Sequence, residues 1–330
     1  MRRRDFIKGI VGTAVAWPLA AHAQQGDRVR RIGVLLVFSE TDRENQARIA
    51  AFREGLQTLG WSEGRNVRIE YRSSAGDPAR EKAAAEELVS SAQDLIVATG
   101  TRALADVQRL TSTIPIVFTQ VSDPVGSGFV TSLARPGGNA TGFQMLETAI
   151  GGKWLGLLKE AAPNVNRVAV LFGSDLGAAG PGWLHAAEAL ARSLDVEVTA
   201  VDSSGGGDIE RAIAAFAGKP NGGLVVTPYP TIVADRASII LLAARHRLPA
   251  IYPYRYFAAE GGLMSYGPDQ VEQWRGAATY VDRILRGAKP SELPVQAPTK
   301  YELVINLKTA KIIGLDIPPA LPLRANEVIE

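Results

Sequence analysis

The chain has 330 residues, with 36 lysines and arginines against 34 aspartates and glutamates, and no cysteine. A chain without cysteine has no disulfide framework and no lipid-modified N-terminal cysteine, so a large apolar core must hold the fold. The nearly balanced charge excludes a broad basic face, and with it nucleic acid as a partner.

The first 23 residues predict a removable export signal. They combine a basic start, an apolar stretch too short to span a bilayer, and the small-residue cleavage site Ala21-His22-Ala23. Residues 3–8, RRDFIK, resemble the twin-arginine signal, and an ordinary secretory signal is the alternative. We expect cleavage after Ala23, a periplasmic location and a mature net charge of about −1. No later segment is apolar enough to insert into a membrane.

The mature chain alternates strand and helix patterns in two successive series. The first series predicts strands at 30–38, 66–72, 94–100 and 114–120, with helices at 41–60, 77–92, 101–110 and 124–134. The second predicts helices at 151–163, 180–194, 207–218 and 231–247, with strands at 166–173, 196–201, 222–228 and 248–254. A further helix is expected over 271–285, and the glycine cluster at 137–142 is expected to form a turn.

This alternation predicts an α/β fold with two doubly wound, Rossmann-like parallel sheets, each covered by helices on both faces. A ligand cleft is expected between the two lobes. We assign residues 1–23 to the cleaved signal, 24–146 to the N-terminal lobe and 147–265 to the C-terminal lobe. Residues 266–330 are expected to form a tail that crosses between the lobes.

The candidate ligand-binding residues are those that follow the predicted strands, because ligands of parallel sheets bind beyond the carboxyl ends of the strands. They are Ser39, Glu40, Thr99, Gly100, Thr101, Gln120, Ser122, Asp123, Ser174, Asp175, Tyr229, Tyr254, Arg255, Ser265 and Tyr266. Thr99 and Thr101, beside a helix start, suit a carboxylate, whereas Asp123 or Asp175 suits an ammonium group. The alternative is that these side chains cap helices and shape turns.

The stretch 251–257, IYPYRYF, carries a second pattern. In an extended chain Tyr252, Tyr254 and Tyr256 share one face, and Arg255 points the other way, towards the cleft or solvent. Aromatic walls and one arginine suit an organic acid, and packing between the lobes is the alternative.

Catalytic and cofactor motifs are scarce in this sequence. There is no H-E-x-x-H, G-x-S-x-G or Walker motif, no G-x-G-x-x-G after the first strand, and no histidine or cysteine cluster for a metal. His185 and His246 fall on predicted helices and are expected at the surface. We therefore expect no enzyme, no cofactor and no metal, but a protein that closes on a ligand.

The sequence resembles the solute-binding proteins of ABC transporters, of the TrpX-like tryptophan/tyrosine-binding type with the type I periplasmic binding protein fold. The resemblance covers nearly the whole mature chain. It is carried by residues 112–142 (STIPIVFTQVSDPVGSGFVTSLARPGGNATG), 261–269 (GGLMSYGPD), 277–315 and 317–330 (IPPALPLRANEVIE). The glycine-rich residues 172–183, FGSDLGAAGPGW, depart from the family where ligand specificity is expected.

The resemblance implies a monomeric scavenger that captures a small organic solute, such as an amino acid or an aromatic or organic acid. It implies delivery of that solute to an ABC permease and its ATPase. Two alternatives stay open: a ligand-sensing subunit that acts on a membrane kinase, and a periplasmic enzyme that uses Glu40, Asp123 or Asp175.

Overall fold

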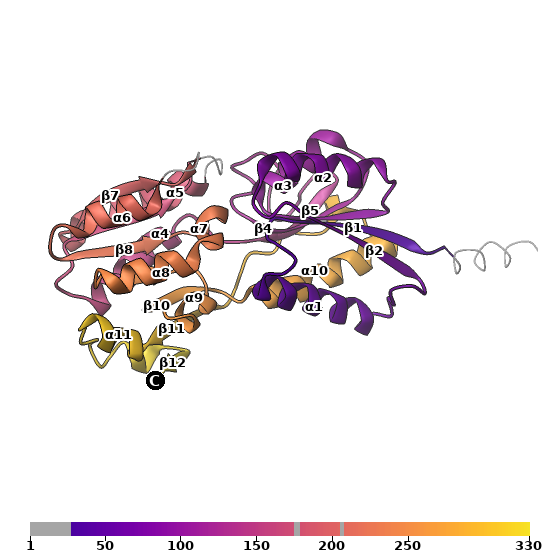
Figure 1. Cartoon of the computed structure of the whole chain (residues 1–330). Coiled ribbons are helices and arrows are strands. Elements are labelled where there is room, and N and C mark those ends of the chain that lie inside the picture. Colours follow the sequence, from indigo (N-terminus) through magenta and orange to yellow (C-terminus); the bar gives the residue numbers. More distant parts are fainter. Residues whose placement is uncertain (1–27, 175–178, 205–207) are drawn as a thin grey trace, which may run out of the picture.

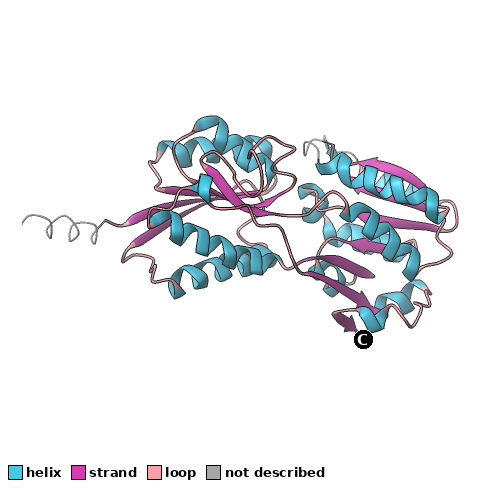
Figure 2. Cartoon of the chain, turned by 180° about the vertical axis from the view of Figure 1, so that it is seen from behind, coloured by secondary structure: helices cyan, strands magenta, loops and turns pink. Residues whose placement is uncertain are grey.

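The computed structural model describes residues 28–174, 179–204 and 208–330. The predicted signal, residues 1–23, and the candidate residue Asp175 lie outside the described residues. The described chain forms two α/β lobes, each built around its own sheet (Figures 1 and 2). The predicted fold class is confirmed.

The sheet of the first lobe is parallel throughout, in the order β2-β1-β3-β4-β5. Its strands are β1 (Arg30–Leu36), β2 (Val67–Ser73), β3 (Leu95–Thr99), β4 (Ile116–Val121) and β5 (Ala140–Gln144). Its helices in this part of the chain are α1 (Arg43–Thr58), α2 (Pro78–Ser90) and α3 (Thr101–Leu110). The strands β3 and β4 are buried along their whole length, because helices cover both faces of the sheet.

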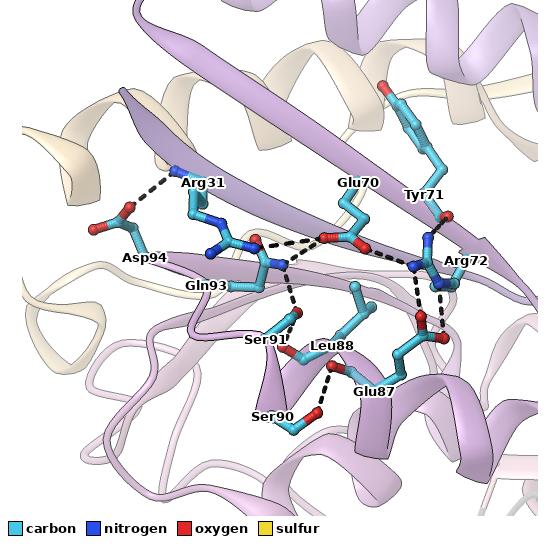
Figure 3. A network of polar contacts seen from close by, with 10 residues as sticks. All are labelled: Arg31, Glu70, Tyr71, Arg72, Glu87, Leu88, Ser90, Ser91, Gln93 and Asp94. Atoms are coloured by element: carbon cyan, nitrogen blue, oxygen red, sulfur yellow. Dashed lines mark hydrogen bonds and ion pairs between the residues drawn. The ribbon is translucent and has the colours of Figure 1, made fainter. Parts of the chain in front are cut away.

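The edge strand β2 is buried on one face at its start and partly exposed from Glu70 onward. Val67 and Ile69 face the core, and the outward side chains form a polar network with α2 (Figure 3). Arg72 lies at its centre, with its Nη2 atom 2.5 Å from Glu70 Oε1 and 2.6 Å from Glu87 Oε1. The hydrogen bond from Arg72 lowers the pKa of Glu87. These contacts hold α2 against an edge strand that has no further strand partner in the described chain.

The second lobe contains a longer, mixed sheet in the order β12-β11-β10-β9-β8-β6-β7. Its strands are β6 (Arg167–Phe172), β7 (Glu197–Asp202), β8 (Gly222–Val226), β9 (Ala250–Tyr252), β10 (Met264–Pro268), β11 (Tyr301–Asn306) and β12 (Glu327–Ile329). Its helices are α4 (Ile150–Ala161), α5 (Ala179–Ala191), α6 (Ile209–Ala217), α7 (Pro230–Ala234), α8 (Arg236–Arg245), α9 (Arg255–Ala259) and α11 (Leu307–Ile313). Strands β6 to β10 pair in parallel, as predicted, and β11, which comes from the tail for which no strand was predicted, runs antiparallel to β10.

The chain passes between the lobes after β5, after β10 and before β11 (Figures 1 and 2). After β10, helix α10 (Gln270–Leu285) lies beside α1 on the first lobe, where Trp274 packs edge-on against Phe52 with ring centroids 5.8 Å apart. Residues 286–300, which lead from α10 back to the second lobe, run along the outer edge of β5. There the amide of Gln296 donates a hydrogen bond to Gly142 O at 2.9 Å. Helix α10 therefore completes a lobe whose other elements come from residues 30–144.

Several local predictions are wrong for identifiable reasons. Residues 124–134 form turns instead of a helix, and the Asp123 side chain accepts a hydrogen bond from the amide of Gly126 within them. The glycine cluster after Pro136 leads into strand β5, where Gly142, at φ +155°, lets the strand approach Phe118 so closely that a Cβ would lie 2.0 Å from its carbonyl oxygen. The predicted helix 231–247 divides at Asp235 into α7 and α8.

Two glycines of α4 test how closely the helices of the second lobe pack. A Cβ on Gly151 would lie 2.0 Å from Trp183 O on α5, whereas a Cβ on Gly156 would meet only Leu190 at 3.6 Å. We predict that Gly151→Ala lowers the free energy of unfolding by roughly 1–3 kcal/mol because α4 and α5 must separate. Gly156→Ala should raise it by about 0.5–1 kcal/mol through helix propensity. Urea denaturation of both variants measures the difference, and equal effects would contradict the observed helix contact.

Candidate functional site

The carboxyl ends of the strands in the two sheets meet in a pocket between the lobes. Its lining is mixed, with apolar rings and a few hydroxyl and amide groups. The first lobe contributes Val37, Phe38, Gly100, Thr101, Gln120 and Ser122, the connection contributes Met145, and the second lobe contributes Pro228, Pro230 and Tyr254. A pocket at a strand-end edge shared by two lobes is where an α/β fold places a ligand.

Two polar side chains of this lining have buried atoms with no hydrogen-bond partner among the described residues. They are Ser122, whose hydroxyl is fully buried, and Gln120, whose side-chain oxygen is unpaired. Thr99, Thr119 and Thr227, which lie at or next to the ends of strands β3, β4 and β8, have unpaired hydroxyls as well. Buried polar groups are nearly always hydrogen-bonded in folded proteins, so this concentration indicates groups that await a ligand or water.

The backbone at the end of β4 presents Gln120 to the pocket. Gln120 has a φ of +56°, and the pairing of β4 with β5 shifts register between Phe118 and Val121. Such bulges and left-handed residues carry a conformational cost and gather at functional sites, where they redirect a side chain.

Helix α3 begins on the same wall of the pocket. Its N-cap is Gly100 at φ +93°, which provides no side-chain cap, and Thr101 opens the helix. The Thr101 hydroxyl accepts a hydrogen bond from the amide of Ser122 at 3.3 Å. A helix N-terminus carries partial positive charge, so this wall favours an anionic group.

Three candidate acidic or hydroxyl residues lie away from the pocket lining. Asp123, at φ +42°, turns its carboxylate to the amide of Gly126 at 2.9 Å, so it caps a turn and does not face the pocket. Ser39 hydrogen-bonds Thr41 at the entry to α1, and Glu40 is exposed on the outer side of that helix.

The loop that follows β6 also forms a local network. The Ser174 hydroxyl lies 2.9 Å from that of Ser204, and both residues donate hydrogen bonds to Asp202. Burial opposes ionisation of Asp202, but these hydrogen bonds outweigh it and lower its pKa to about 2. Ser174 is exposed, and neither it nor Asp202 is part of the pocket lining.

The tyrosines of 251–257 do not share a face, because only Tyr252 lies in β9 and Arg255 starts helix α9. The Tyr254 hydroxyl donates to the sulfur of Met145 at 2.9 Å in the pocket. Arg255 points outward and pairs with Glu327 at 2.6 Å, so the expected clamp is wrong for this arginine. Tyr256 lies between the lobes, under the guanidinium of Arg236.

The remaining candidates belong to the core of the second lobe. Tyr229 is buried with its ring against Gly173, where a Cβ would lie 2.2 Å from the ring. Ser265 and Tyr266 lie within β10, not after a strand, and Tyr266 stacks on Tyr301 with centroids 5.5 Å apart. Neither residue lines the pocket.

One ion pair joins the two lobes at the cleft. Arg236 at the start of α8 places Nη1 2.9 Å from Asp42 of the first lobe and Nε 2.9 Å from Glu260 of its own lobe. Asp42 also caps α1, since its other carboxylate oxygen accepts from the amide of Asn45 at 2.9 Å. Asp42 and Arg236 were not identified as functional residues from the sequence. The position of Asp42 directly before a helix does indicate its capping role.

The described part of the chain contains no cluster of three or more metal-ligating side chains. Within the same residues, every helix is too short or too polar to cross a membrane.

A family model for the ABC transporter substrate binding protein matches residues 31–329. The chain belongs to this family, and the resemblance inferred from the sequence is confirmed. A tyrosine-binding protein of Clostridioides difficile is 25% identical over 265 residues, which cover 80% of this chain and 75% of that protein.

Solved structures share the fold of this family member. A conserved domain protein from Vibrio cholerae is 26% identical, with a TM-score of 0.84, over 91% of this chain and 100% of that one. An ABC domain from Streptococcus pneumoniae in complex with L-Trp is 24% identical, with a TM-score of 0.84 and the same coverage. The ligand-free, open structure of a substrate-binding protein from Clostridium difficile aligns with a TM-score of 0.67 at 22% identity, over 92% of this chain and 99% of that one.

Two buried serines differ in what their hydroxyl groups contact, which suggests different roles in the fold and in the pocket. Ser203 donates to Phe172 O at 2.8 Å, whereas Ser122 has an unpaired hydroxyl. We predict that Ser203→Ala lowers the free energy of unfolding by about 1 kcal/mol, while Ser122→Ala leaves it unchanged or raises it. Chemical denaturation of the mature protein without added ligand measures both. Equal losses in the two variants would mean that Ser122 supports the fold.

Proposed function

We propose that this protein is the periplasmic solute-binding component of an ABC importer. It captures a small organic solute between its lobes and delivers it to a membrane permease and its ATPase. The observation that carries this proposal is the pocket shared by both lobes, with the unpaired groups of Gln120 and Ser122 on its wall. Family membership over residues 31–329 supports the same role.

The pocket wall suits a solute with a flat apolar body and one polar end. Phe38, Tyr254 and two prolines form apolar surfaces, and the start of α3 with Ser122 forms the polar end. The tyrosine-binding relative and the L-Trp complex support an aromatic amino acid or aromatic acid as the first candidate.

Closure of the lobes is the step that retains the solute. The solute contacts both walls only when the lobes are together, so its binding favours the closed form. The ion pair between Asp42 and Arg236 also needs the closed form, because its partners belong to different lobes. The segments that pass between the lobes act as the hinge.

The location follows from the predicted signal, which we propose is removed after Ala23. A sensing role would use the same closure with a different membrane partner. An enzyme that uses Asp123 or Glu40 receives no support, because neither carboxylate lines the pocket.

The solute class is tested by thermal-shift measurements on the mature protein. We predict that L-tyrosine, L-tryptophan or an aromatic monocarboxylate at 100 times its Kd stabilises the protein by about 2.7 kcal/mol. Tyr254→Ala should remove most of this shift, and Tyr301→Ala, which removes an aromatic ring outside the pocket, should keep it. No shift with any of these compounds would contradict the proposed solute class.

The closing ion pair is tested by Asp42→Asn, since asparagine keeps the helix cap and loses the charge. We predict that its Kd for the stabilising solute rises about fivefold, equivalent to about 1 kcal/mol, and that this difference shrinks in high salt. Asp77→Asn is the matched control, because Asp77 caps α2 with no ion pair to the other lobe. Equal Kd values for wild type and Asp42→Asn would show that the pair does not favour closure.

A further inference from the structure

A buried arginine, Arg48, lies in the seam between the lobes and has no anionic partner among the described residues. The side chain of Arg48 on α1 is among the largest fully buried ones. Its guanidinium lies 5.6 Å from the ring centroid of Phe38 and 6.0 Å from that of Tyr256. Nη2 donates to the neutral side chain of Gln270, and Nη1 has no hydrogen-bond partner among the described residues.

The neighbouring Arg236 differs from Arg48 in having carboxylate partners. Both guanidinium groups lie over Tyr256, but Arg236 is paired with Asp42 and Glu260. Arg48 has no carboxylate of the described chain within ion-pair distance. A buried charge without a partner is costly, and contacts with aromatic rings offset only part of that cost. An anionic group bound nearby would therefore interact favourably with Arg48 even without touching it.

Arg48 lies directly behind residues that line the solute pocket. Phe38, which stacks on Arg48, lines the pocket, as does Tyr254. Burial raises the pKa of Tyr254 well above its ordinary value, and the charge of Arg48 is among the groups that oppose this rise. The described lining itself contains no charged side chain. Arg48 and the N-terminus of α3 therefore both place positive charge beside the pocket.

We propose that Arg48 sets the charge specificity of the pocket, so that the solute must carry a carboxylate or a similar anionic group. This inference rests on the proposed solute-binding function. Arg48 acts from behind the wall formed by Phe38 and Tyr254, while Ser122 and the start of α3 offer hydrogen bonds to the anionic group. Arg48 is therefore a specificity-determining residue that holds no solute atom itself.

The test compares each acid with its neutral amide. L-tyrosine and L-tyrosinamide, and L-tryptophan and its amide, are titrated against the mature wild type, Arg48→Met and Arg48→Lys. We expect wild type to prefer the acids, Arg48→Met to lose about tenfold of that preference, and Arg48→Lys to restore most of it. Methionine fills the space between the rings without a charge, and an apolar replacement of a buried charge is commonly tolerated by the fold.

The matched control is Arg53→Met, because Arg53 lies on the same helix over the ring of Tyr71, outside the pocket. Its acid-to-amide ratio should equal that of wild type. If Arg48→Met weakens acid and amide equally, or if wild type binds both equally, the inference is overturned and the proposed function stands. If wild type binds none of the four compounds, the proposed solute class fails, and the inference that rests on it fails as well.

Discussion

The constraint that shapes the seam between the two lobes is the burial of polar groups without hydrogen-bond partners in the described chain. The strands of each sheet are apolar and buried under helices. Polar loops follow the strands at the carboxyl edge of the sheet. Where the two edges meet, Ser122 and Gln120 are withdrawn from water without a partner. Because unpaired buried groups are costly, a hydrogen-bonding group that entered the seam between the lobes would be favoured there.

The route of the chain connects this seam to the segments that pass between the lobes. Helix α10 returns to the first lobe and packs beside α1, so Gln270 at its start lies next to Arg48. The same crossover therefore brings a hydrogen-bond acceptor to the buried guanidinium. On the other side of Tyr256, Arg236 reaches across to Asp42. Arg236 forms an ion pair between the lobes and Arg48 forms none among the described residues, so we propose different roles for them, in closure and in solute choice.

Membership of the ABC transporter substrate binding family accounts for the two-lobed fold, but the solute is decided by a few side chains. The described pocket combines aromatic and proline surfaces with hydroxyl and amide groups and has no carboxylate of its own. On the proposal made above, Arg48 and α3 favour an anionic group at one end of the pocket, and the apolar faces favour a flat body at the other.

Local patterns determined the alternation of strands and helices, since buried parallel strands and amphipathic helices have periodicities that survive in the sequence. They also placed Gly100, Thr101, Gln120, Ser122 and Tyr254 near strand ends, where the structure brings them to one pocket. Only the tertiary structure decided that Asp123 caps its own turn and that Tyr256 lies within the short helix α9. It alone brought Arg48 to Gln270, which lies 222 positions away, because contacts of such separation leave no periodic trace in the chain.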